Sequence, residues 1–164
     1  MWGIRLLHYL LGRRATQVAT VYVWNGRAYL PVHGRAPNGF LWETEPVLEC
    51  DLSGDALGAR LREVVERGHP PIDDPTRDRE RRVPPIHRAL HMRGWRAMTR
   101  AGVLFCMISW HPDGVVLRFS TRRGASIEEL DSEPGATFPP GVDTQAIAHR
   151  IVEEWNARNA GPRD

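Results

Sequence analysis

A run rich in β-branched and aromatic residues lies near the start of the chain, at residues 18–24, and a second partly apolar run follows at residues 27–33. The dipeptide Asn25-Gly26 separates them. Asn-Gly is typical of a type I′ hairpin turn, because both central residues of that turn need a positive φ. The pattern therefore predicts a β-hairpin, followed after a Gly/Pro-rich loop by two short strands at residues 40–42 and 47–51.

A helical period replaces the alternating pattern at Ser53, which is a candidate N-cap. Apolar residues then recur at the spacing of one helix face, and Gly68 is expected to end the helix. The next segment, residues 69–85, is rich in proline and charge. This composition predicts a linker or an exposed loop rather than a packed element.

The second part of the chain shows a similar succession of patterns. Residues 86–100 have the apolar spacing of a helix. Residues 103–110 are almost wholly apolar, which predicts a central strand buried on both faces. Alternation over residues 115–122 predicts a half-exposed strand, and Asp143 is expected to cap a last helix.

These landmarks recur at a nearly constant offset. The turn glycines Gly26 and Gly114 are 88 residues apart, and the caps Ser53 and Asp143 are 90 apart. The spacing favours two similar helix-hairpin-strand-helix halves, at about residues 1–68 and 86–158, joined by the linker at residues 69–85 in a single domain of residues 1–164. Chance recurrence of a common arrangement is the alternative. We expect an α+β fold in which helices cover one face of an antiparallel sheet.

Composition and charge exclude two classes of protein. Hydrophobic residues make up 41% and charged residues 26% of the 164 positions, which excludes a fully disordered chain. The net charge is +2, too small to indicate a protein that coats nucleic acid. All 22 basic residues are arginine, which we interpret as a coding bias.

The cysteines and the N-terminal segment indicate the compartment. Cys50 and Cys106 both lie inside apolar runs, as reduced structural cysteines do. The apolar run within residues 1–14 precedes its basic pair, the reverse of an export signal, and is too short to cross a bilayer. We therefore expect a cytoplasmic protein without membrane contact, whose first residues form a helix on the core; a membrane-surface anchor is the alternative.

Few residues suggest catalysis or metal binding. His87 and His91 are four apart on a predicted helix, a spacing that would suit a metal, but no third ligand is evident nearby. Cys106 and His111 could form a nucleophile and base, yet burial would make that thiol inert. We expect no enzyme, no metal and no cofactor, with a metal-dependent enzyme on the two histidines as the weakest alternative.

An arginine run in the linker supports a different alternative. Arg77, Arg79, Arg81 and Arg82 could contact phosphate. A nucleic-acid-binding protein usually combines such a run with exposed aromatic residues. Most of the six tryptophans lie within predicted strands and helices, which favours a core role for them. A small arginine-rich nucleic-acid-binding or regulatory protein is therefore the second hypothesis, and a solvated loop is the simpler interpretation of the run.

Two segments of the second half resemble a known family. One is residues 93–108, followed by Asp113-Gly114, and the other leads through Asp143 into residues 147–152. This arrangement resembles the bacterial contact-dependent growth inhibition (CDI) immunity proteins, mainly over residues 86–158. The sequence departs from the family in its acidic, glycine-poor loop at residues 125–134.

The resemblance implies a non-catalytic protein that binds the C-terminal domain of its cognate toxin, commonly a nuclease, and blocks the active site. A nuclease is basic where it meets phosphate, so its inhibitor should present carboxylates. Two acidic stretches qualify: Glu43, Glu45, Glu49 and Asp51 in the first, and Glu128, Glu129, Asp131 and Glu133 in the second, which is the preferred contact. Both could equally be solvated loops. Trp42 and Trp110, beside strand ends, are possible aromatic anchors, although core packing is the simpler role.

Overall fold

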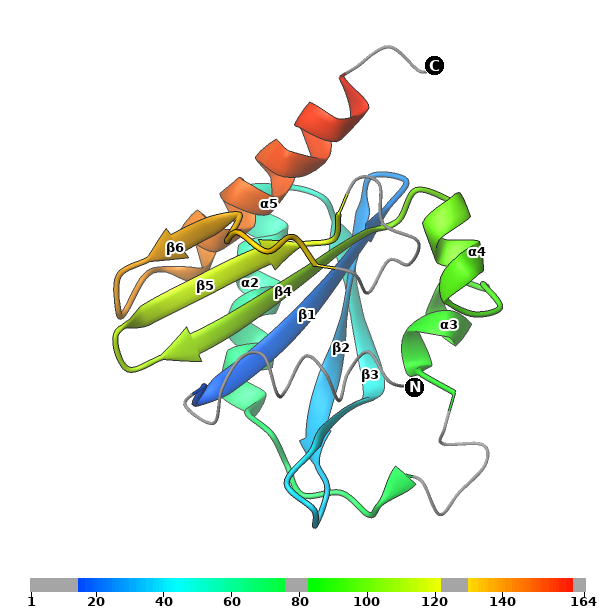
Figure 1. Cartoon of the computed structure of the whole chain (residues 1–164), viewed down its shortest axis with the longest axis vertical. Helices are drawn as coiled ribbons and strands as arrows, with labels where there is room; N and C mark the ends of the chain where they lie inside the picture. Colours follow the sequence, from blue (N-terminus) through cyan, green and yellow to red (C-terminus); the bar gives the residue numbers. More distant parts are fainter. Residues whose placement is uncertain (1–14, 76–82, 122–129, 161–164) are drawn as a thin grey trace.

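The computed structural model of the chain describes residues 15–75, 83–121 and 130–160. Its sheet has six antiparallel strands in the order β3-β2-β1-β4-β5-β6 (Figure 1). The elements are β1 (Gln17–Trp24), β2 (Arg27–Arg35), β3 (Leu41–Asp51), α2 (Gly54–Arg67), α3 (Pro85–Ala89), α4 (Trp95–Arg100), β4 (Leu104–His111), β5 (Gly114–Phe119), β6 (Ala136–Phe138) and α5 (Thr144–Asn159). The predicted α+β class is confirmed.

The first hairpin forms as its turn residues require. Asn25 and Gly26 have φ values of 49° and 72°, and Trp24 pairs with Arg27 across the turn. The two short strands expected after the hairpin are instead one strand, β3. Pro31 of β2 pairs with Val47 and Val32 pairs with Thr44, so two residues of β3 bulge out without ending the ladder.

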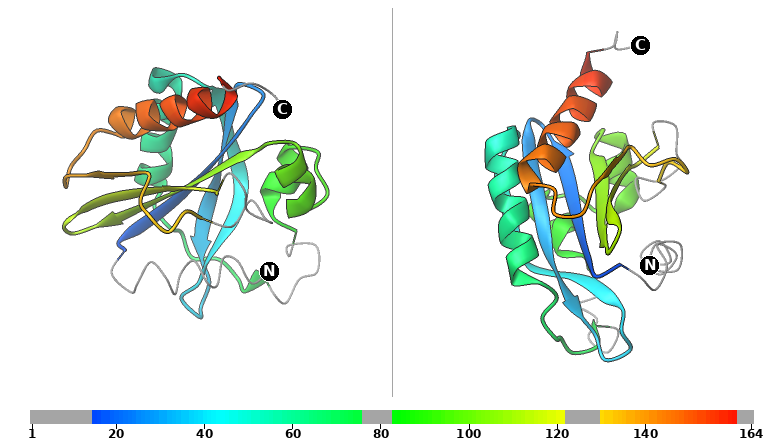
Figure 2. Two further views of the ribbon diagram at one scale, coloured as in Figure 1. Left: turned by 45° about the horizontal axis from the view of Figure 1, so that its top comes forward. Right: turned by 90° about the vertical axis from the view of Figure 1, so that its left-hand side faces the viewer.

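Helices cover both faces of the sheet, which corrects the expectation of one covered face. α2 and α5 pack on a core that contains Val21, whereas α3 and α4 pack on a second core that contains Tyr22 (Figure 2). The reason is visible in the central strands. Residues on both faces of β1 and β4 are buried and mostly apolar, as the sequence of β4 predicts, so each face needs a cover.

The helix predicted over residues 86–100 is interrupted. α3 ends at Ala89, and α4 begins only at Trp95. Between them His91 and Gly94 have positive φ values of 53° and 87°, which an α-helix cannot contain. The apolar spacing is preserved across the break, because Leu90 and Met98 are both buried in the second core.

The strand order is compatible with the predicted repeat but does not show that the two halves are duplicates. β2 and β3 lie on one side of the central β1–β4 pair, and β5 and β6 lie on the other. A long helix follows β3, and another follows β6. The duplication itself stays a prediction.

Within the described ranges, no helix is long and apolar enough to span a membrane.

The two long helices approach each other closely at glycines of α2. Both begin at the predicted caps: the Ser53 hydroxyl accepts from the Ala56 amide, and the Asp143 carboxylate accepts from the Gln145 amide. The carbonyl of Gly58 accepts a 2.8 Å hydrogen bond from the Thr144 hydroxyl. A Cβ atom at Gly58 would lie 2.9 Å from the Cα of Gln145. Position 58 of α2 must therefore be glycine if α5 is to pack this closely.

We expect Gly58→Ala to destabilise the protein by about 1–3 kcal/mol, because the added methyl group must displace the backbone of α5. In an unhindered helix the same change stabilises by about 1 kcal/mol. Urea denaturation measures the difference. Gly54→Ala is the matched control on α2, since the three atoms nearest to its methyl group all belong to the exposed ring of His149, which can rotate away. Equal stabilities of the two variants would contradict the close helix contact.

Candidate functional site

The candidate site begins where β1 and β2 separate. The two strands pair only near their turn, up to Tyr22 and Tyr29, whereas β1 pairs with β4 along almost its whole length. Beyond that point the chain after α2 replaces β1 as the neighbour of β2. The Arg35 amide donates to the Pro70 carbonyl at 2.9 Å, and the Ile72 amide donates to the Arg35 carbonyl at 3.0 Å. Part of the predicted linker is therefore packed, which corrects the expectation that it is an exposed loop.

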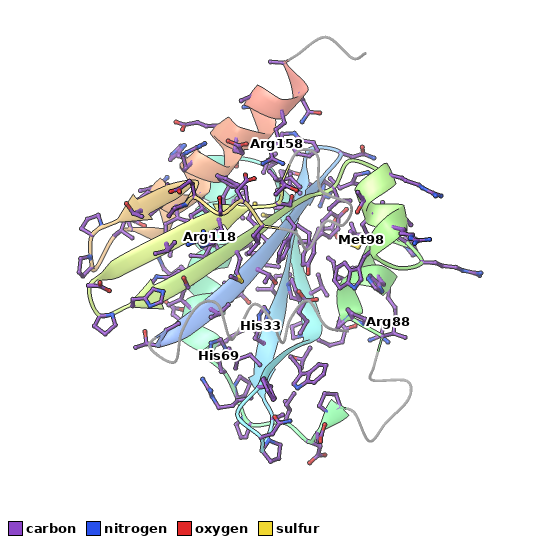
Figure 3. The ribbon with its side chains drawn as sticks, in the orientation of Figure 1. His33, His69, Arg88, Met98, Arg118 and Arg158 are labelled. Carbon is purple, nitrogen blue, oxygen red and sulfur yellow. The ribbon has the colours of Figure 1, made fainter. Side chains whose placement is uncertain are left out.

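His69 fills the space between the separated strands. Its Nε2 accepts a 3.1 Å hydrogen bond from the Val18 amide of β1, and its Nδ1 lies 3.4 Å from the His33 carbonyl of β2. This pattern fits a neutral imidazole with its proton on Nδ1. Partial burial of His69 lowers its pKa, and its ring meets that of His33 edge-on at 6.3 Å (Figure 3).

Glu43 of β3 points to the same region and is held by two hydroxyl groups. Its Oε1 accepts from the Thr20 hydroxyl at 3.0 Å and from the Tyr22 hydroxyl at 2.6 Å. The ring of Tyr22 is fixed in turn by Phe105 at 5.0 Å and by Trp95 of α4 at 6.3 Å between centroids. The two hydroxyl donors and the packed ring of Tyr22 keep the Glu43 carboxyl group in position.

An open groove of about 330 Å³ lies beside Glu43, at the outer edge of the sheet. Ile72 reaches it by lying over Gly34, the residue of β2 that pairs with Trp42 and has no side chain to block the approach. The groove is lined by residues of β3, of α3 and of the chain around it: Trp42, Glu43, Thr44, Glu45, Ile72, Asp73, Pro75, Val83, Pro85 and Arg88. Its volume is at the small end of the ~300–1,000 Å³ typical of ligand sites.

Two features make this groove unusual on the described surface. Val83 is 45% exposed and is the one large hydrophobic residue classed as exposed among the described residues. The indole Nε1 of Trp42 is buried without a hydrogen-bond partner. At the rim, Arg88 Nη2 lies 3.0 Å from Glu45 Oε1, with both side chains more than half exposed. Such an exposed pair contributes little stability, so an incoming ligand can replace it at small cost.

The structure separates the acidic residues that the sequence singled out. Glu43 and Glu45 lie together in the groove. Glu49 and Asp51 lie further along β3, where both pair with Arg27 at 2.5 and 2.8 Å.

The described members of the second acidic stretch, Asp131 and Glu133, lie on the side of the sheet away from β3, next to β5. Asp131 follows Leu130, which bridges to Ser120 just after β5, and the Asp131 amide donates to the Phe119 carbonyl. Arg118 holds this backbone by donating to the Asp131 and Ser132 carbonyls. Glu133 is exposed, and the remaining two members of the stretch, Glu128 and Glu129, lie outside the described residues. Among the described residues, Glu43 and Glu45 therefore lie at a different edge of the sheet from Asp131 and Glu133.

The other candidate groups are distributed through the fold. His87 and His91 do not share a helix face, because α3 ends between them. Cys106 is fully buried, and burial raises the pKa of its thiol strongly, while His111 contacts Ser109 instead. Trp110 is half-buried against the core of α2 and α5. The run from Arg77 to Arg82 lies outside the described residues.

Sequence reasoning missed His69, Thr20, Tyr22 and Arg88. Thr20 and Tyr22 lie on the first strand of the predicted hairpin, but nothing in the local pattern shows that their hydroxyls face an acid 23 and 21 residues away. His69 lies in a proline-rich stretch that the composition assigns to a loop. One signal was present: a histidine directly after a helix-ending glycine can reach back to the adjoining strands.

Comparison with known proteins adds fold information. No protein-family model and no curated protein matches the sequence. A solved protein of unknown function from Neisseria meningitidis does match in structure, with a TM-score of 0.58 and 14% sequence identity over 87% of this chain and 94% of that one. At this identity the likeness shows a shared fold, and nearly the whole of each chain takes part in it.

The contact of His69 with Val18 predicts acid-sensitive stability. Burial lowers the pKa of His69, and also that of His87, in the folded state. The unfolded chain therefore binds more protons, so stability is complete above the ordinary histidine pKa of about 6.5 and is lost as the pH falls toward the folded-state pKa. We expect the melting temperature to fall between pH 7.5 and 5.5.

His69→Gln should reduce that pH dependence, because the glutamine oxygen can still accept from Val18 but does not titrate. Thermal melts at a series of pH values measure the slope. His91→Asn is the matched control, since His91 is exposed and asparagine tolerates its positive φ. An unchanged slope in His69→Gln would show that this imidazole is not the sensitive group.

Proposed function

We propose that this protein is an immunity protein of the CDI type, which binds the cognate toxin domain, a nuclease, and occludes its active site. The single observation that supports this most strongly is the groove at the β3 edge. There, two of the carboxylates expected to contact the toxin, Glu43 and Glu45, lie beside an exposed apolar residue, Val83. Acidic groups around an apolar centre suit a protein partner with a basic site.

The rigidity of the groove supports tight binding. Glu43 is fixed by two hydrogen bonds before any partner arrives, so little side-chain entropy is lost on association. Carboxylates arranged in this way offer a nuclease the negative charge that it normally finds on phosphate. Binding at the active site then blocks the substrate physically, and the inhibitor needs no chemistry of its own.

The arginines favour this function over the nucleic-acid-binding alternative. Many guanidinium groups of the described residues are paired with carboxylates within this chain: Arg27, Arg60, Arg62, Arg67, Arg88, Arg150 and Arg158. Those groups would have to exchange a carboxylate for phosphate in order to bind nucleic acid.

A direct test uses the C-terminal toxin domain that this proposal expects to be encoded beside the gene. Purified protein is titrated into the toxin's nuclease assay, and affinity is measured by calorimetry. We expect stoichiometric inhibition. Glu45→Lys should weaken binding by about 10–100-fold, because it places a cation at a basic interface. The melting temperature should change little, since the Glu45 side chain is 60% exposed.

Two matched charge reversals locate the contact. Glu66→Lys, on the exposed side of α2, should leave the affinity unchanged. Glu133→Lys tests the second acidic stretch at the opposite edge of the sheet. A loss of affinity in Glu133→Lys with none in Glu45→Lys would move the contact to that edge. Absence of toxin binding, together with a salt-sensitive shift of DNA or RNA, would replace the proposal with the nucleic-acid alternative.

A further inference from the structure

Three exposed arginines lie on α4 and in the turn before it: Arg93, Arg96 and Arg100. We propose that these three residues, the arginine patch, bind a carboxylate-rich segment of a protein partner. α4 covers the face of the sheet opposite to α2 and α5 (Figure 2). The inference goes beyond the proposed function, because no member of the patch lines the groove at the β3 edge and the partner need not be the toxin domain.

The patch differs from the other arginines in its lack of partners within the chain. Among the arginines of the described ranges, only these three form neither an ion pair nor a hydrogen bond. The others are bound by carboxylates or by backbone carbonyls: Arg27, Arg35, Arg60, Arg62, Arg67, Arg88, Arg118, Arg150 and Arg158. The guanidinium donors of the patch are therefore available to another molecule.

The arginines of α4 also lack the acidic neighbours that those of the long helices have. On α2, Glu63 pairs with two arginines at 2.7 and 2.8 Å, and on α5 Glu154 pairs with two at 3.2 and 2.8 Å. Arg96 and Arg100 are four residues apart on α4, which places both on one face of the helix, where like charges repel each other. α4 contains no acidic residue, so an acidic group from another molecule is needed to relieve this repulsion.

The chain around the patch adds no compensating charge. Residues 83–112 contain four arginines and no acidic residue. The residues that precede this stretch, 76–82, include four arginines and two acidic residues, so their net charge is positive as well. The protein as a whole carries only +2, which means that positive charge is concentrated in this part of the sequence. A negatively charged partner is therefore complementary to it.

The backbone beneath the patch is fixed before any partner binds. Met98, on the inner side of α4, is fully buried in the second core, and Leu90, at the end of α3, is 3% exposed. Trp95 stacks on Tyr22 with 6.3 Å between ring centroids, and it meets the ring of His87 edge-on at 4.5 Å. The backbone therefore needs no ordering on association, which keeps the entropic cost of binding low.

A carboxylate-rich protein segment fits this patch better than nucleic acid does. Three guanidinium groups can neutralise about three phosphates, fewer than the roughly 6–10 contacts of proteins that bind DNA strongly. Single strands also need an exposed aromatic ring on which to stack, and Trp95, the one aromatic residue of α4, is packed against Tyr22 and His87. Guanidinium groups form paired hydrogen bonds with carboxylates, and arginine and methionine are enriched at protein interfaces. Met92, half-buried, precedes Arg93 directly.

The test uses a small acidic peptide and needs no toxin. N-acetyl-hexaglutamate amide is titrated into the ¹⁵N-labelled chain, with the hexalysine analogue and a six-nucleotide oligothymidine in parallel. We expect shifts of the Nε–Hε signals of the patch and of amides at residues 92–101, with a Kd on the order of 0.1–1 mM at low ionic strength that weakens as salt is added. The lysine peptide should not bind. Equal or tighter binding of the oligonucleotide, shifts confined to other surfaces, or no shift at all would overturn the proposal.

Charge-matched substitutions locate the binding. Arg96→Gln should weaken binding of the glutamate peptide about threefold, and glutamine at all three positions of the patch should abolish detectable binding. The melting temperature of Arg96→Gln should stay the same or rise, because the change breaks no contact and removes the repulsion with Arg100. Arg62→Gln is the matched control, since it removes the same charge from an exposed side chain of α2. An equal loss of affinity in Arg62→Gln would show that binding follows net charge, and would reject the patch.

The patch and the immunity function can fail separately. Neutralisation of the toxin without peptide binding at the patch would reject the patch and keep the immunity function. Peptide binding at the patch without neutralisation of the toxin would keep the patch and reject the immunity function.

Discussion

The separation of β1 from β2 is the constraint on which the site depends. Strands that part leave backbone donors and acceptors without partners, and such groups are costly when buried. Here the chain after α2 supplies the missing partners: His69 accepts from Val18, and residues 70–72 pair with Arg35. The same segment carries Ile72 and Asp73 to the groove, so its position follows from the hydrogen-bonding needs of the sheet.

The separation also makes room for a polar cluster inside the fold. His33 and Thr20 are each only 4% exposed, and Glu43 reaches Thr20 and Tyr22 across the gap. The aromatic residues of α4 and β4 hold Tyr22 in place. The orientation of the Glu43 carboxyl group is therefore set through Tyr22 by the second core, which α3 and α4 cover. A partner that binds there meets a rigid surface.

Much of the fold follows from local sequence. The hairpin at Asn25-Gly26, the caps at Ser53 and Asp143 and the buried strand β4 were all predictable, because each depends on residues close together in the chain. The helix break at His91 was not, because apolar spacing alone does not report a positive φ. The second covered face was implied by the prediction that residues 103–110 are buried on both faces, although the expected architecture covered only one.

The candidate site likewise has residues that could be predicted from the sequence and residues that could not. Glu43 and Glu45 could be chosen from the sequence because acidic residues on a strand are conspicuous, and the structure brings them into one groove. The sequence could not show that the second acidic stretch lies at the opposite edge, since that depends on strand order. Packing of the linker by His69 depends equally on contacts about 50 residues apart in the chain. Both features that the sequence did not predict depend on long-range pairing, which leaves no local pattern in the sequence.

Hydrogen exchange of the protein, free and bound to its toxin domain, tests the central claim most directly. If the β3 edge is the contact, binding should slow exchange at residues 41–45, 70–75 and 85–88, which surround the groove. The β5–β6 edge should exchange at its free rate. Protection confined to residues 114–121 and 130–138, with the groove unchanged, would contradict this account.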